Sequence, residues 1–332
     1  MAVCLCDISA QWFWRHYAPK SGEPVFGHTP GEGPTIPDAL PVKTMPVERD
    51  CHKLTRDIEP TDYQRLCSMG LSAHEPLHVL LARAGKVASS RSTIVHTVDF
   101  DLPAGTLLRC GGALCVTSPE MTLLRACAGL SLVERLKLAY EYCGCYSIRP
   151  ELEGGLVIRH PITSLEELGL CLESSIGMTG AKQLRRILPY VRNGSGSPRE
   201  TALVLLCCLP KKHGGFGLPF PRLNVSLDLG SGSAKLWGRG NAFDLVWEGA
   251  KVILEYDGEL GHATSDQRNR DQRRREAAQS AGYSVFALDK RRIESVSDTF
   301  AVIEKVAERL SFRLRFPSGF RERHLELRSQ LL

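Results

Sequence analysis

Apart from its turn, the segment 243–258 is nearly all β-forming, and three carboxylates interrupt its strands: Asp244, Glu255 and Asp257. Side chains alternate between the two faces of a strand, so Glu255 and Asp257 share a face. If Glu248-Gly249 forms a two-residue turn, Asp244 lies opposite Ile253, and Glu255 is its diagonal neighbour on the same face. Diagonal neighbours are about 7–8 Å apart at the backbone, within reach of one shared ion. A three-residue turn would separate the two acids onto opposite faces.

Carboxylates on one half-buried sheet face repel one another and are poorly solvated, and a divalent cation relieves both costs. Mg²⁺ (or Mn²⁺) takes one or two protein carboxylates and completes its shell with water and phosphate oxygens. Such an ion polarises a phosphodiester and lowers the pKa of bound water. Asp244 and Glu255 are therefore predicted to hold a catalytic metal. The alternative is a surface hairpin in which Asp257-Gly258 is only a turn.

His262 follows Glu255 by seven residues. An ordinary histidine has a pKa of about 6.5, which suits a general base beside a metal-bound water at neutral pH. The alternative is a solvated loop histidine. Glu200 lies in Ser197-Pro198-Arg199-Glu200, which fits a capping box in which Glu200 reaches back to the Ser197 amide. It could also be a peripheral ligand of the metal or of its water.

A predicted helix at 265–281 could contact phosphates through five arginines: Arg268, Arg270, Arg273, Arg274 and Arg275. Guanidinium groups match the geometry of phosphate oxygens. Acids stand four residues before two of them, as in Asp266 with Arg270 and Asp271 with Arg275. That spacing leaves open a salt-bridged helix facing solvent.

The elements that must position these residues follow a flexible break at 194–196. The pattern predicts a helix from 197 to about 209, strands at 222–229, 242–247 and 251–257, a helix at 265–281, a strand at 283–288 and a helix at 296–312. The fold class is therefore α/β, a sheet flanked by helices in the order αβββαβα. We assign this domain to residues 195–315 and a C-terminal tail to 316–332.

The preceding region reads as a smaller α+β domain over residues 51–194. Strands are predicted at 78–83, 92–100 and 107–117, and helices from Ser118 and at 131–144, 163–175 and 179–191. Residues 1–50 form an N-terminal segment with an aromatic cluster at 12–17. That cluster predicts a small docking helix or an interaction element. The stretch 19–46 has seven prolines and four glycines, as expected of a linker.

Composition excludes several classes of protein. The chain has 332 residues, 43% of them hydrophobic, and a net charge of +5, which permits nucleic-acid binding without demanding it. Its twelve cysteines show no metal-binding frame, and no signal peptide or run of about 20 apolar residues is present. We therefore expect a cytoplasmic protein with reduced, mostly buried thiols and no membrane association.

Residues 195–312 resemble a Vsr-like family, related to very-short-patch-repair endonucleases of the PD-(D/E)XK superfamily. The resemblance rests on motifs in order: 197–200, Asp244, 255–258 with His262, and Asp271 with Arg274. It implies a restriction-endonuclease-like αβββαβ core, with Asp244, Glu255 and Glu200 at the family's acidic positions. The superfamily's lysine falls at Asp257, so water activation is left to His262 or the metal, as in Vsr-type enzymes, which use histidine.

Residues 90–190 resemble the middle of AbiEi-type proteins, the antitoxins of type IV toxin–antitoxin systems. The likeness is carried by 117–124 and the helices that follow. It is partial, because those proteins usually begin with a DNA-binding winged helix, and the first ninety residues show no obvious three-helix unit of that kind. It implies a toxin or other protein as a possible partner.

Three functions remain open from the sequence. The first is Mg²⁺-dependent hydrolysis of DNA phosphodiesters, in DNA repair or in defence against phage and mobile elements. The second is a DNA-binding regulator or antitoxin-like protein with a degenerate nuclease fold that does not cleave. The third is a protein-interaction module without affinity for nucleic acid.

Overall fold

A computed structural model describes residues 3–16, 43–44, 76–82, 89, 91, 93–98, 102–103, 105–111, 114–227, 229, 242–258 and 265–332, with the side chains of 3, 43–44, 82, 109–111, 114 and 265–268 left out. The chain is mixed α/β and divides into an N-terminal unit, Met1–Val191, and a C-terminal unit, Arg192–Leu332. The division lies three residues before the predicted break at Gly194. No helix in these ranges is long and apolar enough to cross a membrane.

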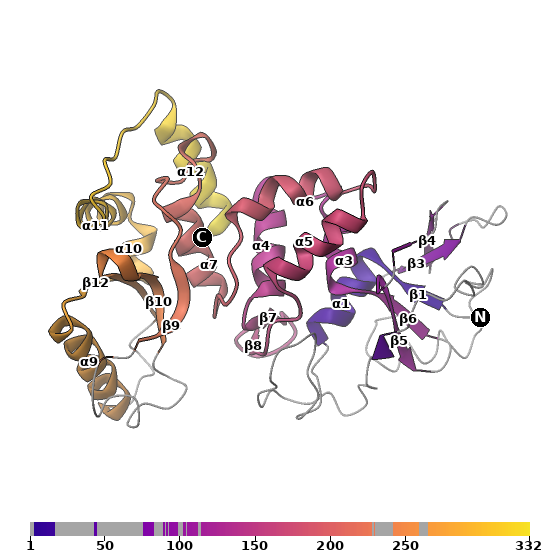
Figure 1. The fold of residues 1–332 in the computed structure, drawn as a ribbon, viewed down its shortest axis with the longest axis horizontal. Helices are drawn as coiled ribbons and strands as arrows, with labels where there is room; N and C mark the ends of the chain where they lie inside the picture. Colours follow the sequence, from indigo (N-terminus) through magenta and orange to yellow (C-terminus); the bar gives the residue numbers. More distant parts are fainter. Residues whose placement is uncertain are drawn as a thin grey trace. The chain divides into compact units, whose positions relative to one another are not determined.

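The N-terminal unit is built on a six-stranded sheet with the order β2-β5-β6-β1-β3-β4 (Figure 1). Its strands are β1 (Val3–Leu5), β2 (Lys43–Thr44), β3 (Leu77–Ala82), β4 (Thr93–Val98), β5 (Leu107–Gly111) and β6 (Leu114–Thr117). β1 pairs parallel with β6 and antiparallel with β3, and β3 pairs parallel with β4. The predicted strand at 107–117 is a hairpin, because the chain reverses between β5 and β6.

Helices complete the N-terminal unit: α1 (Asp7–His16), α3 (Pro119–Ala126), α4 (Leu132–Cys143), α5 (Leu165–Ser174), α6 (Ala181–Ile187) and the 3₁₀ turn η2 (Leu188–Tyr190). A small ribbon of β7 (Tyr146–Ile148) and β8 (Leu156–Ile158) follows α4. Ser118, Ser131 and Ser164 cap their helices through the side-chain oxygen. The aromatic segment forms α1, and its buried Trp14 donates a hydrogen bond from Nε1 to the Thr117 carbonyl.

The C-terminal unit has a four-stranded sheet with the order β12-β11-β10-β9. Its elements are α7 (Pro198–Cys208), η3 (Lys211–His213), β9 (Arg222–Ser226), β10 (Ala242–Trp247), η4 (Glu248–Ala250), β11 (Val252–Asp257), α9 (Ser265–Ser280), β12 (Ser284–Asp289), α10 (Lys290–Glu294), α11 (Val296–Arg309) and α12 (Phe320–Leu331). Only β11 and β12 pair parallel.

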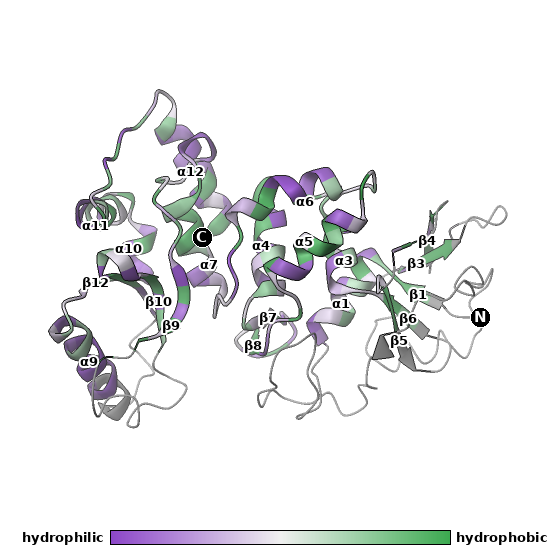
Figure 2. Cartoon of the chain, in the orientation of Figure 1, coloured by the Kyte–Doolittle hydropathy of each residue, from purple (hydrophilic) through white to green (hydrophobic). Residues whose placement is uncertain are grey.

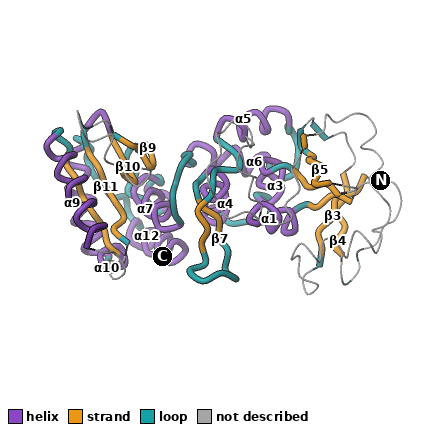
Figure 3. The backbone as a smooth tube through the Cα atoms, turned by 90° about the horizontal axis from the view of Figure 1, so that it is seen from below, coloured by secondary structure: helices purple, strands orange, loops and turns teal. Residues whose placement is uncertain are grey.

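Helices lie on both sides of this second sheet, with α7 and α9 on opposite sides (Figures 1 and 3). Every residue of α7 from Thr201 to Cys208 is buried, as expected of a helix enclosed on all sides. The predicted tail contributes to that enclosure, since α12 packs on α7. Figure 2 shows α9, in contrast, as largely hydrophilic.

The turn between β10 and β11 differs from the predicted two-residue turn. Trp247 pairs with Val252, so four residues, Glu248 to Lys251, make the connection. Lys251 closes it in the left-handed conformation, with φ of 51°. The predicted pairing of Asp244 with Ile253 is therefore wrong, because Ile253 pairs with Val246. Compared with a two-residue turn, each β10 residue pairs with the β11 residue two positions further along the chain. Because side chains alternate between faces, a shift of two leaves the same side chains on the same face.

Candidate functional site

Asp244 lies at the end of β10, beside β11 but outside the regular backbone pairing of the two strands. The two strands pair over three positions, from Trp247↔Val252 to Leu245↔Leu254. One step further, Oδ2 of Asp244 accepts a hydrogen bond from the backbone N–H of Tyr256 at 2.7 Å. The carboxylate thus takes the place of a backbone acceptor and lies close to the plane of the sheet. Continued by one step, the register would put Asp244 level with Glu255.

The neighbouring strand β9 is irregular at the same level. Its register with β10 runs through Phe243↔Val225 and Leu245↔Leu223, and Asn224 between them has a left-handed φ of 48°. The Asn224 amide donates to Oε2 of Glu200 at 2.7 Å and to the Gly194 carbonyl at 2.8 Å. This side chain therefore ties the first turn of α7 to the sheet next to Asp244.

Glu200 is held by a capping arrangement that differs from the predicted capping box. Ser197 caps α7 as expected, since its Oγ accepts the Glu200 N–H at 3.1 Å. The Glu200 carboxylate, however, accepts the N–H of Gly196 at 2.7 Å, one residue before the predicted Ser197 amide. Because Oε2 also accepts from Asn224, the acid is directed toward the sheet.

Glu255 is only 3% exposed and is bound by two arginines of α9. Its Oε1 accepts from Arg274 at 2.5 Å, and its Oε2 accepts from Nε of Arg275 at 2.9 Å. Arg275 also donates to Asp257 at 3.1 Å. Arg274 donates to the Ala242 carbonyl as well, so it bridges the ends of β10 and β11. Both arginines are thus internal partners of Glu255, one of the two acids predicted to bind the metal.

The other arginines of α9 have different surroundings. Arg270 and Arg273 are exposed on the helix. The side chain of Arg268 lies outside the described residues, as does His262. The predicted pair of Asp271 with Arg275 is absent from the described part of α9, because Arg275 turns to the sheet. Asp271 lies 3.8 Å from Arg274 instead.

The surroundings of Asp244 disfavour the ionised form of its carboxyl group. Burial raises the pKa of its carboxyl well above the usual value, and the negative charges of Glu200 and Glu255 raise it further. The Tyr256 N–H and the Arg274 guanidinium oppose that rise in pKa without cancelling it. The negative charges of Glu200 from α7 and Glu255 from β11 thus act on Asp244, the acid that either a proton or a cation would neutralise.

These acids do not form a compact ligand cluster. Among the described residues, one group of three or more possible metal ligands has its ligand atoms within 4.8 Å of one another: Cys6, Asp7 and His96. Glu200, Asp244 and Glu255 are not such a group. The Cys6 group was missed from the sequence because its members come from distant strands, and Cys4 and Cys6 are too closely spaced for a zinc knuckle. The adjacent Cys6-Asp7 pair at a strand end was the available signal.

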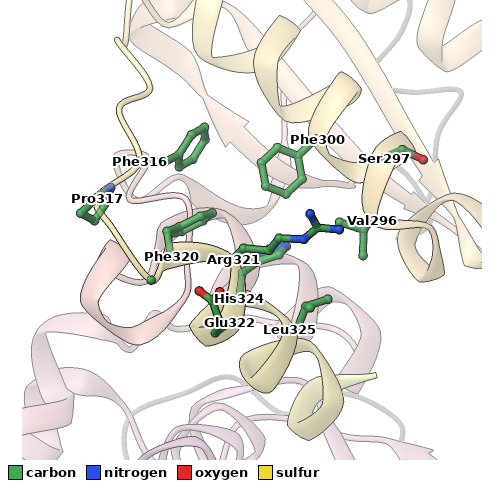
Figure 4. Close-up of a pocket in the computed structure, with 11 residues that line it drawn as sticks. Val296, Ser297, Phe300, Phe316, Pro317, Phe320, Arg321, Glu322, His324 and Leu325 are labelled. Atoms are coloured by element: carbon green, nitrogen blue, oxygen red, sulfur yellow. The ribbon is translucent and has the colours of Figure 1, made fainter.

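A cavity of about 750 Å³ lies between α11 and α12 (Figure 4). Phe300, Phe316 and Phe320 line it, with the ring of His324 behind them. His324 is 1% exposed, and its Nδ1 lies 2.7 Å from the Gly214 carbonyl. Its Nε2 has no hydrogen-bond partner within the described ranges. The rings primarily form a small aromatic core that joins α12 to the unit.

Comparisons of the chain with models of protein families, with curated proteins and with solved structures gave no match.

Proposed function

We propose that the C-terminal unit is a metal-dependent endonuclease domain that hydrolyses DNA phosphodiester bonds. The proposal rests on Asp244 at the irregular end of β10, whose carboxylate accepts the Tyr256 N–H and is acted on by the negative charges of Glu200 from α7 and Glu255 from β11. The element order α7-β9-β10-β11-α9-β12, with β12 parallel to β11, supports a restriction-endonuclease-like core. The Vsr-like resemblance of residues 195–312 supports the same assignment.

The acids fit a divalent cation such as Mg²⁺ or Mn²⁺. Arg274 compensates the negative charge of Asp244 only in part, and an ion would supply the remaining positive charge. Glu255 would be the second ligand, because each carboxylate oxygen has two lone pairs and the arginines use one on each. When bound, the ion would stabilise charge on the phosphate and lower the pKa of a bound water.

The remaining residues have supporting roles in this proposal. Arg274 and Arg275 orient Glu255, and Arg275 places positive charge beside Asp257, where the superfamily has its lysine. A guanidinium group stays protonated and cannot act as a base. Water activation therefore remains assigned to His262 or the ion. Arg270 and Arg273, exposed on α9, would contact the phosphate backbone.

Cleavage of supercoiled, linear and mismatched DNA by the full chain tests the proposal. Nicking should require Mg²⁺ or Mn²⁺ and stop in EDTA. Asp244→Asn should lower the rate by more than about 100-fold, beyond what loss of an outer partner of a metal site costs. Asp298→Asn, at an exposed position in the first turn of α11, is the matched control and should cleave normally. Metal-independent cleavage, or equal rates in both variants, would contradict the proposal.

A second candidate is a DNA-binding regulator that does not cleave. It is favoured by the arginines that already neutralise Glu255 and Asp257. It predicts a gel shift without nicking in any metal, unchanged by Asp244→Asn and weakened by salt through the loss of phosphate contacts. Absence of both cleavage and binding would favour the third possibility, a protein-interaction module.

A further inference from the structure

At the end of β1, Cys6 lies level with His78 on the neighbouring strand β3. The backbone N–H of Cys6 donates to the His78 carbonyl at 3.0 Å, which extends the register of Cys4 with Leu80 by one pair. On the far side of β3, Leu80 pairs with His96 of β4. Residues level with each other, and residues two apart, share a face. Cys6, His78 and His96 therefore lie on the same side of the sheet.

The polar atoms of these residues meet beside Asp7. Nε2 of His96 lies 3.3 Å from Oδ2 of Asp7 and 3.0 Å from Nδ1 of His78. The Cys6 sulfur, an Asp7 oxygen and a His96 nitrogen are all within 4.8 Å of one another. A cation at this point would take lone pairs from Cys6, Asp7 and His96, and the His78 nitrogen lies beside the His96 nitrogen.

Asp7 is held in position for such a role. Nε and one terminal nitrogen of Arg125 donate to its two oxygens at 3.2 and 2.9 Å. Its φ of 47° lies in the left-handed region that residues other than glycine rarely adopt. Carboxylates that bind metals are commonly oriented by a hydrogen bond from a neighbouring group, and Arg125 provides one here.

We propose that Cys6, Asp7 and His96 bind a Zn²⁺ ion, with His78 as the fourth ligand. One sulfur, two imidazole nitrogens and one carboxylate oxygen form a set that suits Zn²⁺, and four protein ligands make a closed, structural site. The ion would join the β1–α1 connection to β3 and β4. The site belongs to the N-terminal unit and is independent of the proposed nuclease activity.

Metal content and spectroscopy of the full chain test this site. The protein, stripped with a chelator, should take up stoichiometric Zn²⁺ in calorimetry, and Co²⁺ should give a thiolate-to-metal charge-transfer band. Cys6→Ser should abolish the band, and His96→Gln should weaken Zn²⁺ binding by more than about 100-fold. The matched controls are Cys127→Ser, at another fully buried thiol, and His160→Gln, both of which should bind like the wild type.

Two further measurements separate the outcomes. Asp244→Asn should leave Zn²⁺ uptake unchanged, which distinguishes this site from the acids of the C-terminal unit. Zn²⁺ should raise the melting temperature of the wild type but not of His96→Gln, whose fold is checked by circular dichroism. No stoichiometric uptake by the wild type, or the same charge-transfer band in Cys6→Ser and Cys127→Ser, overturns the proposal.

Discussion

Asp244→Asn is expected to stabilise the metal-free C-terminal unit while it abolishes the proposed cleavage. The substitution keeps an oxygen that can accept the Tyr256 N–H, and it removes a buried charge that Glu200 and Glu255 repel. Burying an inadequately compensated polar group costs about 1–3 kcal/mol in proteins. We therefore expect the variant to gain about 1–3 kcal/mol at near-neutral pH in EDTA, and each kcal/mol corresponds to about 2–4 °C in a domain of this size.

The pH dependence of this gain follows from the raised pKa of Asp244. An aspartate in an unfolded chain has a pKa of about 3.9, so between that value and the native pKa the native state binds more protons. The stability of the wild type therefore falls as pH rises through this window. The Asn variant lacks that contribution, so the gain should be small near pH 4 (roughly the unfolded pKa) and grow as pH rises.

Urea unfolding in EDTA measures this difference, followed by tryptophan fluorescence, to which the buried Trp247 is one of four contributors. The control is Asp298→Asn, an exposed change expected to alter stability by no more than about 1 kcal/mol through the helix dipole. Added Mg²⁺ should stabilise the wild type and leave Asp244→Asn unaffected. A variant that is less stable than the wild type at neutral pH, or a difference that does not change with pH, would refute the electrostatic reasoning.

Glu255→Ala and Gly180→Ala test the packing of the chain, with Gly169→Ala as the control for the second. Glu255→Ala should destabilise the C-terminal unit by about 3–5 kcal/mol, because it removes the buried acid that the 13%-exposed side chain of Arg274 contacts most closely; an unchanged urea midpoint would mean that the pair is dispensable. Gly180→Ala should cost the N-terminal unit at least about 2 kcal/mol, since φ is 97° and a Cβ would lie 1.8 Å from the Leu124 carbonyl oxygen. Gly169→Ala, in α5 with open space around it, should instead gain about 0.5–1 kcal/mol in the same titration. Equal effects of the two glycine substitutions would argue against the close approach of Gly180 to Leu124.

Periodicity and capping residues predicted most of the regular structure. The helix at 265–281 and the strand at 283–288 correspond to α9 and β12 within a residue at either end. Short elements escaped prediction: β1 has three residues, and β7 and β8 also have three each. Such strands are too short for an alternating pattern to be recognised, and they exist because neighbouring strands supply their hydrogen bonds.

The candidate site was predictable in its residue types but not in its pairing. Asp244 and Glu255 stand out because carboxylates are rare in β-forming segments. That Arg274 and Arg275 reach Glu255 depends on how α9 packs on the sheet, which helix periodicity does not specify. Asn224 has a left-handed backbone in β9, and the Asp244 side chain accepts a backbone N–H of β11. Strict alternation of side chains between the two faces of a sheet predicts neither feature.

The sequence by itself determined where most of the longer helices and strands begin, because caps, glycines and hydrophobic spacing act between residues a few positions apart. Tertiary structure alone decided which charges neutralise each other and which distant side chains meet. Glu255 with Arg274, and Cys6 with His96, are contacts across strands and helices, and their formation depends on register and packing, which involve the whole unit at once.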